Sequence, residues 1–236
     1  MQQPTILVIH GVTMSGRSML RLLGPVADAL RAAGFALVAP DGGARMSTEQ
    51  VAGLVSWART AYAKREQDAD AAFCEGVFWE GAEHFDWFDA RTGANGEKTF
   101  AGLEASLASV RAATEGHRVV GILGFSQGCA MAALASGLAV HGQLPFGDTL
   151  RFGVYIGGFK PAFDHPAVEA WPVGGVAAML IAGTDDAIFP DPAGIEALAR
   201  EFSEPELHIV EGLQHTVPRS PEWVSRIARF AARHGA

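Results

Sequence analysis

The chain has 236 residues, of which 49% are hydrophobic and 19% charged, and its formal net charge is −8 at pH 7. This length and apolar content suffice for one α/β domain with a large core. The acidic balance and the lack of any basic run argue against a nucleic-acid partner. No apolar stretch reaches the roughly 18 residues of a membrane span.

The N-terminus and the cysteines indicate the compartment. Residues 1–5 lead directly into an apolar run and carry no charged leader region, so we expect no signal peptide. Cys74 and Cys129 lie far apart and form no C-x-x-C motif, which favours reduced thiols over a disulfide framework or a zinc site. We therefore expect a cytoplasmic protein without a metal or other cofactor.

Short apolar runs alternate with helical patterns along most of the chain. Residues 5–10 form a continuous apolar run that ends at Gly11, as in a strand buried on both faces. Further strands are predicted at 35–39, 118–123, 151–156, 176–182 and 206–210. Helices are predicted at 18–33, 48–64, 101–114, 127–141, 195–202 and 221–234. This alternation is typical of a mostly parallel sheet with helices on both faces.

Two stretches, residues 68–100 and 157–175, interrupt this alternation. The first carries eight acidic and two basic residues and is rich in aromatic residues, and the second is punctuated by Pro and Gly. Long irregular loops in a compact domain are usually functional. We expect both to form a cap or an apolar acyl pocket with an acidic rim; the alternative is extra core with a solvated acidic face. The predicted substrate-binding aromatic residues are Trp79, Trp87, Phe88 and Phe159.

The first irregular stretch also gathers possible metal ligands. These are Glu80, Glu83, His84, Asp86 and Asp89. Their spacing matches no ligand motif, so we expect no metal site.

The motif Gly124-Phe-Ser-Gln-Gly128 reads G-x-S-x-G between an apolar strand and a helix of small residues. This is the setting of a nucleophile elbow, which holds a serine in a strained conformation at the carboxyl end of a strand. The two glycines are needed because a Cβ would collide with the neighbouring strand or helix. The alternative is a serine that only caps the helix.

A serine nucleophile needs a base and an acid that orients the base. In an α/β-hydrolase the acid and then the histidine follow the serine along the chain, each after a strand. Asp186 follows the strand 176–182 in a G-x-x-D-x-x-x-P pattern, with Asp185 as the other candidate. His215 follows the next strand. We therefore predict the triad Ser126–Asp186–His215.

An oxyanion hole needs backbone N–H donors. Gln127, directly after the predicted nucleophile, supplies one. The second is expected from the loop after the first strand, where Gly11 lets the backbone pass close to the site. Val12 is the first choice for this donor and Thr13 the second, and we also expect Thr13 to contact the substrate.

The same loop allows a different interpretation. Residues 11–18 read G-x-x-x-x-G-R-S, which is one residue short of a phosphate-binding P-loop because Arg17 stands where lysine is required. Only Asp41 could hold the magnesium ion. A nucleotide-binding function would also leave the predicted triad unexplained.

These pieces resemble the α/β-hydrolase superfamily, and within it the FSH branch (family of serine hydrolases) and the related carboxylesterases and acyl-thioesterases. The matching segments are His10-Gly11, Gly124-Phe-Ser-Gln-Gly128, Tyr155-Ile-Gly-Gly-Phe159, Gly183-Thr-Asp-Asp186, His215-Thr-Val-Pro218 and Trp87-Phe-Asp89. The resemblance covers about residues 5–235. One departure is Val12-Thr-Met-Ser, which replaces the glycine-, asparagine- or glutamine-containing turns typical of the oxyanion loop.

The resemblance implies an α/β-hydrolase fold in a single domain, residues 1–236, that hydrolyses small-molecule esters or thioesters. The aromatic loops favour apolar acyl groups of short to medium length, and an acidic rim would disfavour polyanionic substrates such as acyl-CoA. We therefore expect a carboxylesterase, with an acyl-thioesterase as the alternative. A non-catalytic hydrolase-fold binding protein is a third possibility, against which the intact Ser, His and Asp argue.

Overall fold

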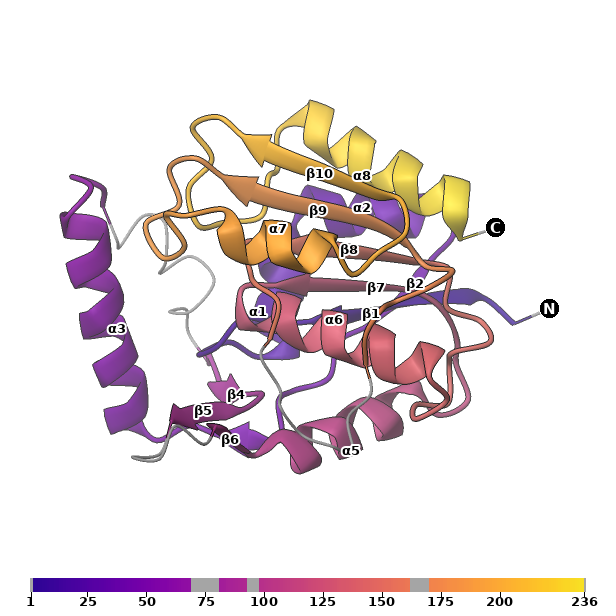
Figure 1. Ribbon diagram of the computed structural model, residues 1–236, viewed down its shortest axis with the longest axis horizontal. Helices are drawn as coiled ribbons and strands as arrows, with labels where there is room; N and C mark the ends of the chain where they lie inside the picture. Colours follow the sequence, from indigo (N-terminus) through magenta and orange to yellow (C-terminus); the bar gives the residue numbers. More distant parts are fainter. Residues whose placement is uncertain (1, 69–80, 93–97, 162–169, 236) are drawn as a thin grey trace.

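The structure is a computed structural model and describes residues 2–68, 81–92, 98–161 and 170–235. Within these residues the centre is a sheet of six parallel strands in the order β10-β9-β8-β7-β1-β2 (Figure 1). The strands are β1 (Pro4–Ile9), β2 (Ala36–Val38), β7 (Arg118–Phe125), β8 (Phe152–Ile156), β9 (Ala177–Gly183) and β10 (Pro205–Val210). The predicted parallel sheet is confirmed.

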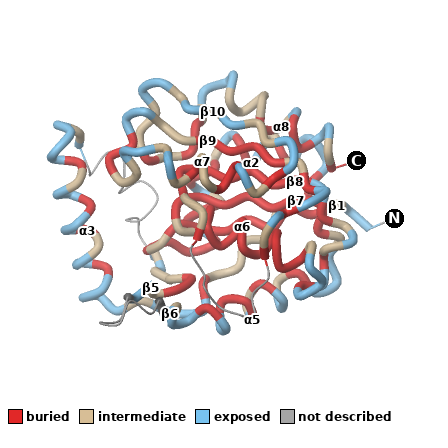
Figure 2. The backbone as a smooth tube through the Cα atoms, in the orientation of Figure 1, coloured by how far each residue is buried: buried red, intermediate tan, exposed pale blue. Residues whose placement is uncertain are grey.

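Helices cover both faces of the sheet (Figure 1). One face carries α1 (Gly16–Leu23), α2 (Pro25–Ala32) and α8 (Pro221–His234), and the other carries α5 (Leu103–Thr114), α6 (Gln127–Val140) and α7 (Ala193–Ala199). Successive β1 side chains alternate between the two cores, with Val8 in the first and Ile9 in the second. Figure 2 shows that burial extends over the sheet and α6. Among the described helices, none is long and apolar enough to cross a lipid bilayer.

The single helix predicted over residues 18–33 is wrong, because α1 and α2 are separate helices that meet at Gly24. Gly24 has a φ of 47°, and its N–H closes α1 on the carbonyls of Leu20 and Arg21. Pro25, the first residue of α2, has no N–H to donate to the preceding turn. Both helices bury residues in the same core. The helical spacing of apolar residues therefore continues from α1 into α2, and the sequence pattern does not reveal the break.

The stretch at 68–100 is less irregular than predicted where the structure describes it. β4 (Phe85–Asp86) pairs antiparallel with β3 (Ala44–Arg45), and β5 (Asp89–Thr92) with β6 (Lys98–Ala101). Strands of two to four residues are too short to produce a recognisable alternation. Residues 69–80, 93–97 and 162–169 lie outside the described part, so the expected cap stays a prediction there.

Helix α3 (Thr48–Ala63) lies beyond the carboxyl ends of the sheet strands (Figure 1). A capping box formed by Ser47 and Gln50 closes its N-terminus. After its C-terminus, Arg65 Nη1 and Gln67 Nε2 donate to the carbonyl oxygens of Thr184 (3.1 Å) and Asp185 (2.8 Å). The C-terminal end of α3 is therefore attached to the loop after β9, which carries the predicted triad acid.

Helix α6 approaches strand β1 closely at Gly128. A Cβ on Gly128 would lie 2.2 Å from the carbonyl oxygen of His10 and 2.5 Å from that of Ile9. A Cβ on Gly124 would lie 2.2 Å from the carbonyl oxygen of Gly128. Backbone atoms cannot move aside as the end of a flexible side chain can, so the packing of α6 on β1 and β7 requires glycine at both positions.

The substitution Gly128→Ala should therefore destabilise the protein by about 3 kcal/mol or more, since the overpacked methyl group meets backbone on the facing strand. The matched control is Gly53→Ala on α3, where an added Cβ meets nothing within 4 Å. That change should stabilise the protein by about 0.5–1 kcal/mol because alanine is the better helix former. Urea unfolding measures both, and equal midpoints for Gly128→Ala and the wild type would contradict the packing argument.

Candidate active site

Ser126 stands at the turn between β7 and α6. Its φ of 57° and ψ of −125° are rare for a residue with a side chain. The turn is held from two sides, since the Ser126 N–H donates to the carbonyl of Ile156 (2.9 Å) and the Ser126 carbonyl accepts from the N–H of Cys129 (2.9 Å). The strand, the strained serine and the helix together have the geometry of a nucleophile elbow.

The structure brings Ser126, His215 and Asp186 together in one hydrogen-bonded series. His215 Nε2 lies 3.0 Å from Ser126 Oγ, and His215 Nδ1 lies 2.7 Å from Asp186 Oδ2. All three residues are buried, with 7%, 4% and 2% of their surfaces exposed, respectively. This is the geometry needed for the serine to pass its proton to the imidazole.

The backbone around Asp186 favours its carboxylate form. Asp186 Oδ1 accepts from the N–H groups of Ile188 and Phe189, both at 2.8 Å. Burial by itself raises the pKa of Asp186, but His215 and these hydrogen bonds outweigh burial, so the pKa lies below its ordinary value. The neighbouring Asp185 is exposed, and its side chain contacts Thr184 instead. The geometry thus selects Asp186 over Asp185 as the partner of His215.

The sheet topology explains why these residues meet. The chain leaves β1 toward β2 on one side, whereas β7 continues to β8 on the other, and such a switch point opens a crevice at the carboxyl edge. Ile9 on β1 pairs with Gly124 on β7, so the loops that follow both strands start at the same level. The loops after β9 and β10 bring the acid and the histidine to the same edge.

The two candidate second oxyanion donors differ in their hydrogen bonding. The Thr13 N–H donates to the carbonyl of Phe85 (3.1 Å), and its hydroxyl donates to the carbonyl of Val12 (2.5 Å). Thr13 is therefore wrong as a free donor. Its side chain is fully buried, and a substrate contact at Thr13 stays a prediction. The N–H groups of Val12 and Gln127 have no acceptor among the residues that the structure describes. Both therefore remain candidates for the oxyanion hole.

His10 orients the Val12 N–H, a role that was not predicted from the sequence. Its Nδ1 donates to the carbonyl of Gly11 (2.7 Å), and its Nε2 accepts from the N–H of Gly42 (2.9 Å). The Gly11 carbonyl and the Val12 N–H belong to one trans peptide and point in opposite directions. Holding the carbonyl therefore fixes the direction of the N–H. The signal in the sequence is a histidine at the end of a buried strand.

The four aromatic residues predicted to line a substrate pocket do not share one environment. Trp87 and Phe88 are buried in the core, with 0% and 4% exposed surface, because they pack in the cluster of α5 and α6. Neither fits the predicted role of a pocket-lining residue. Phe159 is half-buried and its ring lies 5.5 Å from that of Phe189. Trp79 lies outside the described residues.

Aromatic rings enclose the imidazole of His215. The ring of Phe125 lies 4.9 Å from it and that of Phe189 lies 5.4 Å from it. Phe189 is only half-buried, and through its contact with Phe159 it extends an apolar wall outward from the triad. Phe189 is not among the residues predicted for the site from the sequence, although it lies within the pattern that identified Asp186.

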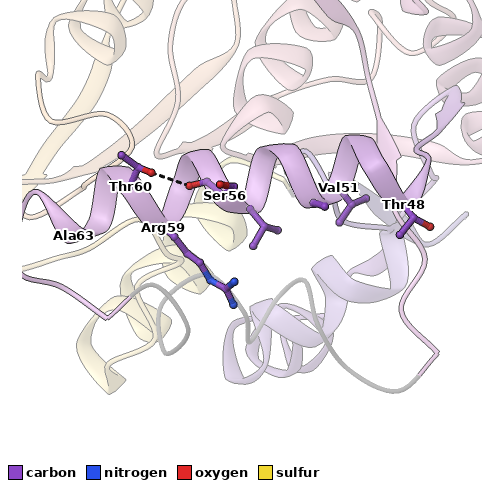
Figure 3. A pocket seen from close by; sticks show the side chains of 8 residues that line it. Thr48, Val51, Ser56, Arg59, Thr60 and Ala63 are labelled. Atoms are coloured by element: carbon purple, nitrogen blue, oxygen red, sulfur yellow. Dashed lines mark hydrogen bonds between the residues drawn. The ribbon is translucent and has the colours of Figure 1, made fainter.

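A groove of about 760 Å³ runs along one side of α3 (Figure 3). The described residues that line it all belong to this helix: Thr48, Val51, Ala52, Val55, Ser56, Arg59, Thr60 and Ala63. No triad residue lines it, so the groove is separate from the hydrogen-bonded series described above.

The described residues contain no group of three or more side chains that could hold a metal ion. In the acidic stretch, Glu83 pairs with Arg45 at 3.3 Å and Asp89 with Arg91. Glu80 lies outside the described part. The acidic side chains that are described are thus engaged by protein groups.

The P-loop interpretation does not fit the loop after β1. The Gly16 N–H donates to Asp41 Oδ1 (2.8 Å), and the side chain of Ser15 caps α1 by accepting from the N–H of Ser18. A Cβ on Gly16 would lie 1.9 Å from the carbonyl oxygen of Ala39, so this glycine serves close packing. The polar groups that would hold a phosphate and magnesium bind the protein itself.

The fold and the site define an α/β-hydrolase. The family described as "Serine hydrolase (FSH1)" matches residues 1–227, so the chain belongs to this family and is a serine hydrolase. Over 92 residues the chain is 34% identical to Esterase OVCA2 of Danio rerio, a match that spans 38% of the chain and 40% of that relative.

Solved structures share the fold over nearly the whole chain. Esterase PE8 superposes with a TM-score of 0.59 at 18% identity, covering 99% of this chain and 93% of its own. Zea mays acyl-protein thioesterase 2 superposes with a TM-score of 0.59 at 18% identity, covering 100% and 95%. At these identities the likeness establishes the α/β-hydrolase fold.

His10 gives the stability of the protein a pH dependence. Burial lowers the pKa of His10 to about 4, although the hydrogen bond to Gly11 and the charge of Asp41 both favour its proton. Between pH 6.5 and pH 4, His10 is therefore mostly protonated in the unfolded chain and mostly neutral in the folded protein. The free energy of unfolding should fall by about 3 kcal/mol as the pH falls from 6.5 to 4.

Urea unfolding of the wild type and His10→Gln measures this contribution. The glutamine cannot titrate, so the difference between the two proteins should change by that amount across the interval. His208 and His234 also have lowered pKa values, but both proteins contain them. Parallel pH profiles would show that His10 is not the buried neutral group.

Proposed function

We propose that this serine hydrolase is a carboxylesterase that cleaves small neutral esters with apolar acyl groups of short to medium length. The observation that carries the proposal is the buried series Asp186–His215–Ser126, with distances of 2.7 Å and 3.0 Å. Membership of a serine hydrolase family and the partial match to a protein named as an esterase support it.

The reaction proceeds in two acyl transfers. Ser126 Oγ attacks the ester carbonyl carbon while His215 Nε2 takes the hydroxyl proton. The N–H groups of Val12 and Gln127 stabilise the resulting oxyanion, which is worth roughly 3–4 kcal/mol for each donor in such sites. The imidazolium then returns the proton to the leaving alcohol oxygen, and an acyl-enzyme remains. Water attacks the acyl carbon by the same route and releases the acid.

The aromatic wall supports an apolar substrate group. Phe189 and Phe159 extend outward from His215, so a hydrocarbon chain attached to the reacting carbonyl would exchange water for aromatic surface. The net negative charge of residues 68–100 supports neutral over polyanionic substrates. Thioester hydrolysis is the second candidate, because the same triad chemistry applies and one structural neighbour is named as an acyl-protein thioesterase.

A fluorophosphonate probe should label the wild type and fail to label Ser126→Ala. Asp186→Asn should lower kcat for an activated ester by about 10⁴-fold, because the histidine loses the group that fixes its tautomer. Asp185→Asn is the matched control and should retain wild-type kcat, since the Asp185 side chain does not contact His215. A wild-type protein that the probe does not label would overturn the proposal, and loss of activity in Asp185→Asn would reassign the acid.

A panel of p-nitrophenyl esters and matched thioesters of increasing chain length tests the substrate class. Short- to medium-chain esters should have the highest kcat/KM, and Phe189→Ala should reduce the gain per added methylene while leaving the acetate rate nearly unchanged. Higher salt should narrow the preference for neutral esters over acyl-CoA, because it screens the acidic charge. A preference for acyl-CoA that ignores salt would favour the thioesterase alternative.

A further inference from the structure

The side chain of Gln127 makes three hydrogen bonds to three consecutive residues. Its Nε2 donates to Asp86 Oδ1 (2.6 Å) and to the carbonyl of Phe88 (2.8 Å), while its Oε1 accepts from the N–H of Trp87 (3.1 Å). Only an amide can donate and accept in this pattern. Gln127 thus binds the segment 86–88 firmly, although oxyanion stabilisation requires only its backbone N–H.

The same segment contacts the loop after β1. The Trp87 indole N–H donates to the carbonyl of His10 (2.8 Å), and the two rings lie 4.7 Å apart. Just before it, the Phe85 N–H donates to the carbonyl of Met14 (2.9 Å), and the Phe85 carbonyl accepts from the N–H of Thr13 (3.1 Å). Segment 84–88 therefore lies along residues 10–14 and contacts them on both sides of Val12.

These contacts form a continuous path from one oxyanion donor to the other. The path leads from the Gln127 side chain to Trp87, from Trp87 to His10, and from His10 through the Gly11 carbonyl to the Val12 N–H. Trp87 and His10 are both fully buried, so water does not compete for these hydrogen bonds. The loop itself contains Thr13 at a φ of 64°, and the β pairing described for it is the antiparallel bridge between Met14 and Phe85, which joins it to the same segment 84–88.

We propose that Gln127 is a positioning residue whose side chain, acting through Trp87, sets the distance between the two oxyanion donors. This inference rests on the proposed function, because it assigns the Val12 and Gln127 N–H groups to the oxyanion. Donors must lie within a few tenths of an ångström of their productive positions, and a misplacement of about 1 Å can lower a rate by about 100-fold. The contacts of Gln127 and Trp87 hold the loop after β1 and the start of α6 at that precision.

The experiment compares Gln127→Met, Trp87→Phe and the double variant. Methionine keeps the length of the side chain but removes all three hydrogen bonds, and phenylalanine keeps a ring but removes the indole N–H. Each single variant should lower kcat for an activated ester by about 10- to 100-fold with KM changed less than threefold. The affinity of a trifluoromethyl ketone, which forms an oxyanion on the enzyme, should fall by the same factor as kcat/KM. The double variant should be little worse than the poorer single variant, because both interrupt one path.

Hydrogen exchange provides a readout that does not depend on activity. The amides of Thr13 and Met14 should exchange faster in Gln127→Met and Trp87→Phe than in the wild type. The matched control is Thr149→Val, which removes a 2.7 Å hydroxyl-to-carbonyl bond to Val119 at the amino end of the sheet. It should lower stability without changing kcat or the exchange of these two amides.

The outcomes separate this inference from the proposed function. Unchanged exchange of residues 13 and 14 in Gln127→Met would overturn the brace, whatever the activity. Wild-type kcat and inhibitor affinity in the folded variants would also overturn it. An inactive wild type would contradict the carboxylesterase function, while faster loop exchange in the variants would still support the mechanical link. If Gln127→Met does not fold, Trp87→Phe alone is decisive through the same measurements.

Discussion

The pairing of β1 with β7 is the constraint on which the candidate active site depends. Both strands are buried and parallel, and with Ile9 opposite Gly124 they end at the same level. The loop after β1 and the turn that carries Ser126 therefore start side by side. Because the chain continues to opposite sides of the sheet, the space in front of them stays open. The contact of Gly128 with the backbone of β1 then fixes how closely α6 follows the serine.

Several groups at this edge are held in a backbone conformation or a buried environment that costs free energy. Ser126 has a left-handed φ, Asp186 is a buried carboxylate, and His10 is a buried imidazole with a lowered pKa. Such states persist only where the surroundings over-determine them. Here each buried polar side chain has hydrogen-bond partners on both sides, and the serine turn is tied to β8 and α6.

Two aromatic residues of the first interrupting stretch, Trp87 and Phe88, have a different environment from the one predicted from composition. An exposed aromatic cluster would line a pocket, but Trp87 and Phe88 are in the core. Trp87 uses its indole N–H on the backbone beside the oxyanion loop. The apolar wall near the triad comes instead from Phe159 and Phe189, which follow β8 and β9. The proposed loop positioning and the proposed substrate contact therefore belong to different segments.

The sequence by itself determined the fold class and the region of the site. Buried parallel strands are short continuous apolar runs, which can be recognised locally. Since all such strands end at one edge of a sheet, the residues that follow them, Ser126, Asp186 and His215, could be expected to meet there. The steric need for Gly124 and Gly128 was likewise evident from the motif.

Only the tertiary structure decided between neighbouring residues. Asp186 rather than Asp185 faces the histidine because the N–H groups of Ile188 and Phe189 hold its carboxylate. Thr13 is unavailable as a donor because its N–H already donates to the carbonyl of Phe85, which is distant in sequence. The physical reason is the same in both cases. A step of one residue changes the direction of a side chain or an N–H, and the group that it then meets, His215 for Asp186 and Phe85 for Thr13, is brought there by the packing of segments distant in sequence.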